Sequence, residues 1–239
     1  MSRPKLCFYA MLATMITFAA AEKLNGRLKE SALPHMSANG PAPAGSFSRK
    51  TAIPPADFLP IQSKDAKGLR AGKVLVASRE LGDPHFVETV ILLVQYDAQG
   101  VLGLILNRRT DIPISRALEG VKAAKDRSDP VYLGGPVETA AFALLQSPTK
   151  VKGAEPVFDS VYLITSKPLF EQTISARPDS GVFHVYLGYA GWTQDQLQKE
   201  VELGAWFIFP AQASTVFNAH PDSLWQEMIR KTELQMAHD

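Results

Sequence analysis

One glycine- and aromatic-rich stretch constrains the fold of this chain more than any other. The apolar run Val182–Leu187 has the composition of a β-strand and leads into the block Gly188–Trp192, Gly-Tyr-Ala-Gly-Trp. Thr193 is a favourable helix N-cap, and Gln196 follows at the spacing of a capping box. Three later residues share one face of a helix: Leu197, Val201 and Gly204. The glycines suit a backbone that turns sharply or is approached closely by another segment. The stretch therefore predicts a strand, a tight glycine turn, an amphipathic helix and a further strand at 206–209.

Apolar patterns elsewhere in the chain predict a mixed α+β domain. Further segments have the length and apolar content of strands: 72–77, 90–96, 101–106, 131–133, 141–145 and 161–164. Other segments space their apolar residues as helices do: 113–125, 167–176 and 221–234. The run 90–96 is almost uninterrupted, which indicates a strand buried on both faces.

The first 69 residues differ in composition from the rest. Residues 1–21 combine a basic start, an uncharged run at 6–21 and small residues before Glu22, which is the pattern of a secretory signal. An uncleaved anchor is the alternative, although the run is shorter than the ~20 residues of a membrane-spanning helix. Residues 22–69 are rich in Pro, Ser, Ala and Gly, and this composition predicts a flexible linker. The folded domain is expected at 70–239.

The charge of the domain limits its partners. The whole chain has a net charge of +1, but residues 70–239 carry 16 Lys and Arg against 20 Asp and Glu, a net charge of −4. Direct DNA binding is therefore not expected. Membrane contact is expected only through residues 6–21, if they remain uncleaved. Cys7 is the single cysteine, and the histidines lack the spacing of a helical metal site, so no metal or other cofactor is expected.

Several short motifs resemble the YqgE/AlgH family, also called UPF0301. The matching segments are Asp83–Phe86, Gly100–Leu104, Leu106–Arg108, Gly134–Val137, Gly188–Trp192, Gln196-Leu197, Glu200 and Ala205-Trp206. Arg109 stands where the family usually has a proline. The resemblance implies a single compact domain of mostly antiparallel strands, which form a partly barrel-like body with flanking helices. It also implies a link to transcriptional control of exopolysaccharide, without an assigned biochemical activity.

The same motifs supply the candidate ligand-binding residues. These are Asn107, Arg108, Gly134, Gly135, His184, Gly188 and Tyr189. Arg108 offers a fork of donors that suits a carboxylate or phosphate, and a basic residue at the position of His184 could contact an anion. Each also has a structural alternative: Asn107 could bond loop backbone, Arg108 could face solvent, and His184 could point outward from its strand. If these residues bind one ligand, they should converge on one cleft.

The aromatic residues and Glu200 receive mainly structural interpretations. Trp192 and Trp206 are expected in the core with the Tyr189 ring beside them, because aromatic side chains bury a large area. An aromatic-lined ligand pocket beside the glycine turn is the alternative. Glu200 is expected to close a surface salt bridge, a contact that usually contributes under about 1 kcal/mol.

Three functions are compatible with these features. The favoured one is a non-enzymatic binding or regulatory protein, because the sequence has no G-x-S-x-G, Walker or metal motif and no catalytic residue is assigned. An enzyme acting on a small anionic ligand in a cleft near the two glycine turns is the alternative. An exported envelope interaction protein is the third. The expected partner is an unknown protein or a small anionic ligand. The expected location is exported, periplasmic or envelope, with the cytoplasm usual for the family as the alternative.

Overall fold

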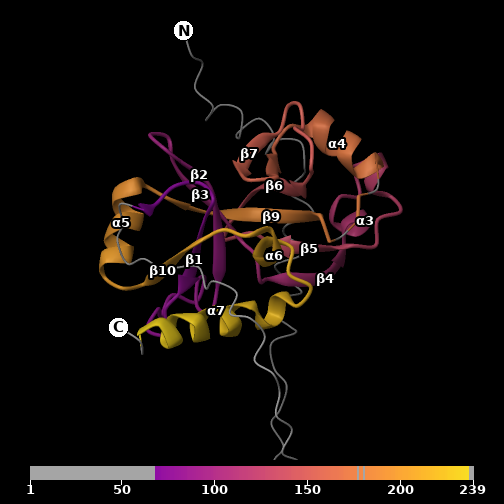
Figure 1. Cartoon of the computed structure of the whole chain (residues 1–239). Coiled ribbons are helices and arrows are strands. Elements are labelled where there is room, and N and C mark those ends of the chain that lie inside the picture. The colour runs from indigo at the N-terminus through magenta and orange to yellow at the C-terminus, as the bar shows by residue number, and fades with distance from the viewer. Residues whose placement is uncertain (1–67, 177, 180, 237–239) are drawn as a thin grey trace, which may run out of the picture. The chain divides into compact units, whose positions relative to one another are not determined.

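The computed structural model describes residues 68–236, except 177 and 180 (Figure 1). The predicted signal at 1–21 and most of the predicted linker at 22–69 lie outside the described residues. Leu69, the last residue of the predicted linker, is buried in the core. Within the described part of the chain, no helix combines the length and the hydrophobicity needed to cross a bilayer.

Ten strands form one mostly antiparallel sheet. They are β1 (Lys73–Ala77), β2 (Val90–Asp97), β3 (Gly100–Ile105), β4 (Arg109–Pro113), β5 (Pro130–Leu133), β6 (Val137–Gln146), β7 (Glu155–Phe158), β8 (Val161–Ile164), β9 (Phe183–Trp192) and β10 (Trp206–Pro210). The main order is β10-β1-β2-β3-β9-β6-β8-β7, and β5, itself paired with β4, joins the sheet through β9. The β5–β9 pair is parallel.

The sheet is curled into a half-barrel with helices packed against it (Figure 1). Five strands separate β1 from β7 in the sheet order, yet a Cβ on Gly72 would lie 3.0 Å from the Cβ of Phe158 in β7. The helical elements are α3 (Ile114–Ala117), the 3₁₀ turn η2 (Lys122–Ala124), α4 (Lys167–Ser175), α5 (Gln194–Glu202), α6 (Ala213–Val216) and α7 (Pro221–Met236). α7 packs against β1, α5 against β3 and β10, and α4 against η2. The expected α+β half-barrel is therefore confirmed.

β9 separates two hydrophobic cores, because successive side chains of a strand point to opposite faces. Tyr186, Ala190 and Trp192 belong to the larger core, which residues of α5 and α7 complete. Phe183 and Val185 belong to the smaller core, which residues of α3, η2 and α4 complete. A strand covered on both faces needs apolar residues at nearly every position, which explains the composition of the stretch before the glycine block.

The predicted turn at the glycine block is wrong. β9 continues through Gly188–Trp192 as one strand of 10 residues, and helix α5 starts only after it. The Thr193 cap is confirmed, because its hydroxyl oxygen accepts a hydrogen bond from the Gln196 N–H at 3.1 Å. Gly204 is exposed rather than part of the helix face. The other two residues of the predicted face are buried as expected: Leu197 and Val201.

The predicted helix at 113–125 is wrong in length. One helical turn, α3, ends at Leu118, whose φ of −121° and ψ of 47° lie outside the helical region. Gly120 follows, a residue of low helix propensity, and the chain then forms only the 3₁₀ turn η2. The apolar pattern nevertheless predicted the buried residues correctly, because all four of them lie in the smaller core: Ile114, Ala117, Leu118 and Val121.

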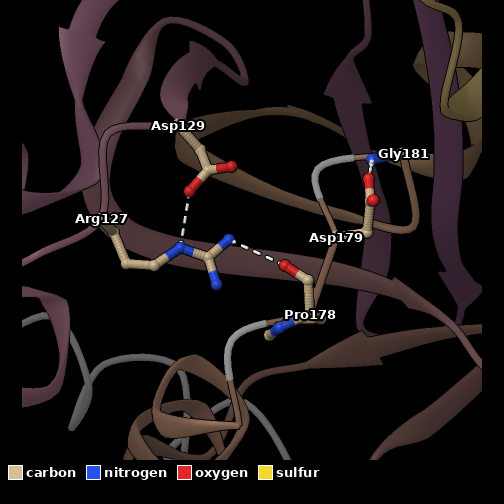
Figure 2. A network of polar contacts seen from close by, with 5 residues as sticks. All are labelled: Arg127, Asp129, Pro178, Asp179 and Gly181. Carbon is tan, nitrogen blue, oxygen red and sulfur yellow. Dashed lines mark hydrogen bonds and ion pairs between the residues drawn. The ribbon is translucent and has the colours of Figure 1, made fainter.

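Arg127 ties the smaller core to the segment that leads into β9 (Figure 2). Its Nε donates to Asp129 Oδ2 at 2.6 Å, and its Nη2 donates to the Pro178 carbonyl oxygen at 3.1 Å. The guanidinium also lies over the Phe183 ring, 5.5 Å from the ring centroid. Arg127 is buried, and a buried charge is tolerated only when it is paired and hydrogen-bonded. These contacts fix the start of β9, and with it the position of the candidate site further along the strand.

Candidate functional site

Three of the predicted site residues, Gly134, Gly135 and Gly188, meet where β3, β5 and β9 come together, and we call this place the glycine junction. The Gly134 N–H donates to the Leu187 carbonyl oxygen at 2.7 Å. The Ile105 N–H in turn donates to the Gly134 carbonyl oxygen at 2.9 Å. The chain leaving β5 therefore bridges the backbones of β3 and β9.

Direct contact between backbone segments explains the glycines. A Cβ on Gly134 would overlap the carbonyl of Gly188, and a Cβ on Gly135 would overlap the backbone of Tyr189. A Cβ on Gly188 would lie 2.7 Å from the Gly135 carbonyl oxygen and 2.8 Å from that of Val137. Gly188 also has a φ of +73°, which other residues rarely adopt. The glycines thus allow three backbone segments to touch one another.

The Asn107 side chain is used to close the loop before β2. Its Oδ1 accepts a hydrogen bond from the Val90 N–H at 2.8 Å, and its Nδ2 donates to the Glu88 carbonyl oxygen at 2.8 Å. The Leu106 N–H also donates to the Val90 carbonyl oxygen at 2.8 Å, so Asn107 extends the pairing of β2 with β3. Glu88 has a φ of +54°, an unusual value for a residue other than glycine, and the hydrogen bond from Asn107 Nδ2 helps to stabilise this conformation. The side chain of Asn107 therefore has the structural role given above as the alternative, because it forms hydrogen bonds with the loop backbone.

Arg108 follows directly and is partly buried. Its carbonyl oxygen accepts a hydrogen bond from the Leu133 N–H at 2.9 Å, which attaches this residue to the end of β5. Burial lowers the pKa of Arg108, because desolvation disfavours the charged form, while the nearby Asp83 carboxylate raises it. Among the residues that the structure describes, its guanidinium has no hydrogen-bond or ion-pair partner. Arg108 therefore differs from Asn107, whose polar groups the fold already uses.

His184 lies in a buried cluster with two tyrosines. The Tyr132 hydroxyl is 3.4 Å from His184 Nε2, and the Tyr186 hydroxyl is 3.4 Å from His184 Nδ1. The Tyr132 ring stacks on the imidazole with 4.5 Å between centroids, and Phe217 packs against it at 5.1 Å. Only 8% of His184 is exposed, so the interpretation of an outward-facing strand residue is wrong.

Both tyrosines of this cluster have altered acidity. Complete burial raises the pKa of Tyr186 well above its ordinary value, and the neighbouring Tyr132 adds to the shift. Burial also raises the pKa of Tyr132, an effect that Arg109 opposes and Asp222 reinforces. Burial therefore favours the neutral, protonated form of both phenol groups in the folded protein.

We expect the free energy of unfolding to fall as the pH rises above about 10, the ordinary pKa of tyrosine. Above that pH the unfolded chain releases the protons of Tyr132 and Tyr186, whereas the folded chain keeps them. Below it, their contribution to stability is fully present and constant. Denaturant unfolding across this range, with phenolate absorbance as a second signal, measures the decline. Tyr186→Phe should make the decline shallower, and an equally steep decline in this variant would contradict the assignment.

Glu200 forms the centre of an aromatic cluster that no local sequence pattern indicates. Its Oε2 accepts hydrogen bonds from Trp206 Nε1 at 2.9 Å and from Trp192 Nε1 at 3.1 Å, and its Oε1 accepts one from Gln196 Nε2 at 2.9 Å. The expected surface salt bridge of Glu200 is therefore wrong. Phe86 stacks on Trp192 at 5.5 Å between centroids, and Trp192 meets Trp206 edge-on at 6.2 Å. Core positions for both tryptophans are confirmed.

The backbone segments that carry the predicted site residues lie close together, but the side chains of these residues contact different parts of the protein. Asn107 bonds the loop before β2, His184 contacts tyrosines of the larger core, and the Tyr189 ring packs edge-on against Phe142 at 5.9 Å between centroids. Ligand binding by the predicted set stays a prediction. In the part of the chain that the structure describes, no group of three or more His, Cys, Asp or Glu could hold a metal ion.

Comparisons with known proteins agree with this structure. A family model described as AlgH-like matches residues 74–237. A UPF0301 protein from Anaeromyxobacter dehalogenans is 34% identical over 185 residues, which cover 73% of this chain and 93% of the relative. A UPF0301 protein from Streptomyces avermitilis is 32% identical over 173 residues, or 70% of this chain and 88% of the relative.

Solved structures match the fold as well. The solution structure of the AlgH protein from Pseudomonas aeruginosa superimposes with a TM-score of 0.56 at 27% identity, covering 68% of this chain and 88% of that one. A crystal structure of a protein from Corynebacterium diphtheriae gives a TM-score of 0.57 at 21% identity, with 68% and 87% covered. The half-barrel, its motifs and these matches lead to one conclusion: the chain belongs to the AlgH-like family.

Proposed function

We propose that this AlgH-like chain is a non-enzymatic binding or regulatory protein. The observation that carries the proposal is the use of the polar motif residues by the fold itself. The oxygen and the nitrogen of the Asn107 side-chain amide both form hydrogen bonds with backbone groups at the loop before β2. Glu200 accepts the indole N–H groups of Trp192 and Trp206. Groups that are already bonded in this way hold the fold together, and recognition is left to side chains such as Arg108.

An enzyme acting on a small anionic ligand is the second candidate, and the His184 cluster is the observation in its favour. An imidazole with a tyrosine hydroxyl at 3.4 Å from each nitrogen is a chain of groups that can exchange protons. His184 lies on β9, four residues before Gly188 of the glycine junction. On this account His184 would move a proton while Arg108 holds the anionic group.

Ligand-observed NMR on the purified full-length chain separates the two candidates. Phenyl phosphate and benzoate present a phosphate and a carboxylate on the same ring, so saturation transfer reports binding of either group. The proposal predicts that phenol is released from phenyl phosphate no faster than in buffer, and saturation transfer to either probe would identify a small anion, rather than a protein, as the partner. Phenol formation that scales with protein concentration would favour the enzyme and contradict the proposal.

We also propose that the protein works outside the cytoplasm, as residues 1–21 suggest. Intact mass and fractionation of the natively expressed protein test this proposal. A mature chain that starts near Glu22 in an exported fraction would support an envelope partner and would remove direct transcriptional control. A full-length cytosolic chain would contradict export and would make the regulatory role associated with the family the leading account.

A further inference from the structure

We propose that Arg108 binds the oxyanion of the ligand, a carboxylate or a phosphate group, and that Asp83 is a resident counter-ion whose influence the ligand replaces. This inference rests on the proposed binding function and names the chemistry of its site. It assigns one residue to recognition and a second, nearby residue to the control of affinity.

The position of Arg108 is fixed from both sides. The preceding residue, Asn107, is clamped to Glu88 and Val90 through its amide. The carbonyl of Arg108 itself is bonded to the N–H of Leu133, at the end of β5. The backbone therefore holds the arginine in place before any ligand arrives, so little backbone entropy is lost on binding.

The side chain of Arg108 is suited to bind an anion. A guanidinium carries five N–H donors in a fork that matches a carboxylate or phosphate. Arg108 is partly buried, and within the described residues its donors bond to no protein group. Partial desolvation lowers the pKa of Arg108 because it disfavours the charge. An oxyanion bound to the fork would relieve this cost and satisfy the donors together.

Asp83 compensates the charge of Arg108 without closing on it. The loop that carries Asp83 is held beside Arg108 by the hydrogen bond from Asn107 Nδ2 to the Glu88 carbonyl oxygen, and the Asp83 carboxylate raises the pKa of Arg108. Yet Asp83 Oδ1 accepts a hydrogen bond from the His85 N–H at 2.8 Å, which keeps the carboxylate on its own loop. A ligand oxyanion would therefore meet a free guanidinium and a repelling carboxylate. Removing the charge of Asp83 should strengthen binding, a sign that a purely structural role for Arg108 does not predict.

Arg109 offers a matched control for charge. It is the next residue, it is exposed, and on β4 it pairs with Tyr132 of β5. Arg108 precedes β4 and is partly buried, whereas Arg109 is the first residue of β4 and is exposed, so we expect that Arg109 does not share the oxyanion with Arg108. A ligand attracted only by local positive charge would respond to both arginines alike.

The test is a titration of the full-length chain with inorganic phosphate and, separately, with acetate, followed by amide NMR shifts of residues 83–90 and 107–109. Arg108→Gln should weaken binding by about tenfold or more, and Arg108→Lys by less, because lysine keeps the charge and loses the fork. Asp83→Asn should tighten binding by about threefold or more, since a repelling charge is removed. Arg109→Gln should stay within about twofold. Tighter binding of phosphate or of acetate identifies the group, and either result supports the site.

Three results would overturn the inference. The first is a folded Arg108→Gln variant that binds both anions as the natural chain does. The second is weaker binding by Asp83→Asn. The third is the absence of shifts with either anion in the natural chain, which would remove the oxyanion site while leaving a protein partner for the proposed function. Conversion of phenyl phosphate, by contrast, would contradict the proposed function and not the site.

Discussion

Replacing Gly188 by alanine is expected to lower the free energy of unfolding by about 2–5 kcal/mol. The backbone there has a φ of +73°, which costs a residue with a Cβ roughly 1–2 kcal/mol. The new Cβ would also lie 2.7 Å from the Gly135 carbonyl oxygen and 2.8 Å from that of Val137. Neither atom is the end of a flexible side chain, so strands must separate, and overpacking of this kind typically costs a further ~1–3 kcal/mol.

Gly204→Ala is the matched control for this prediction. Gly204 has a φ of +82°, close to that of Gly188, but a Cβ there meets no atom within 4 Å. It should therefore lose only the conformational part, about 1–2 kcal/mol. Urea unfolding followed by circular dichroism measures both variants. Equal losses would mean that the contact at the glycine junction contributes nothing, contrary to the interpretation given for it.

Replacing Glu200 by alanine is expected to lower the free energy of unfolding by about 2–4 kcal/mol. The indole N–H groups of Trp192 and Trp206 would both lose their acceptor, and each buried unpaired donor costs roughly 1–3 kcal/mol. Glu200 is partly exposed, so water can reach part of the space and keep the loss below the upper limit. Tryptophan fluorescence should shift as well, because the carboxylate contacts both indole rings.

Two variants control for the loss of the Glu200 charge and for changes in helix propensity. Glu202→Ala removes an exposed carboxylate from the same helix and should change stability by less than about 0.5 kcal/mol. Glu200→Gln keeps an acceptor oxygen for the indoles and should lose less than Glu200→Ala. If Glu202→Ala were as damaging as Glu200→Ala, the contacts with the tryptophans would not explain the effect.

The parts of the fold that depend on local apolar patterns could be predicted from the sequence. The expected strand at 90–96 corresponds to β2 at Val90–Asp97, and the expected helix at 167–176 to α4 at Lys167–Ser175. β4 and β7 escaped prediction because they are short, contain proline and are defined by their partners. In β4, Arg109 and Pro113 pair with β5 in an irregular register, a contact that no local pattern reports.

The candidate site was harder to predict, because its contacts join distant segments. The glycine block is compatible with either a sharp turn or a close backbone approach, and the structure shows the close approach, between Gly188 and Gly135. Glu200 stood at the right spacing for a helix-surface ion pair, whereas its partners are tryptophans from β9 and β10. Only the packing of α5 on the sheet brings these groups together. The family resemblance identified the motif residues, and the structure shows which contacts each of them makes.

Native-state hydrogen exchange at the glycine junction tests most directly whether the motif residues build a rigid support for Arg108. Three backbone N–H groups report on the junction. The Gly134 N–H donates to the Leu187 carbonyl oxygen, the Ile105 N–H donates to that of Gly134, and the Leu133 N–H donates to that of Arg108. The account predicts that all three exchange only through global unfolding, with exchange free energies equal to the unfolding free energy measured in denaturant. Exchange through local opening, at several kcal/mol less than global unfolding, would mean that the junction is a mobile site and would contradict the account.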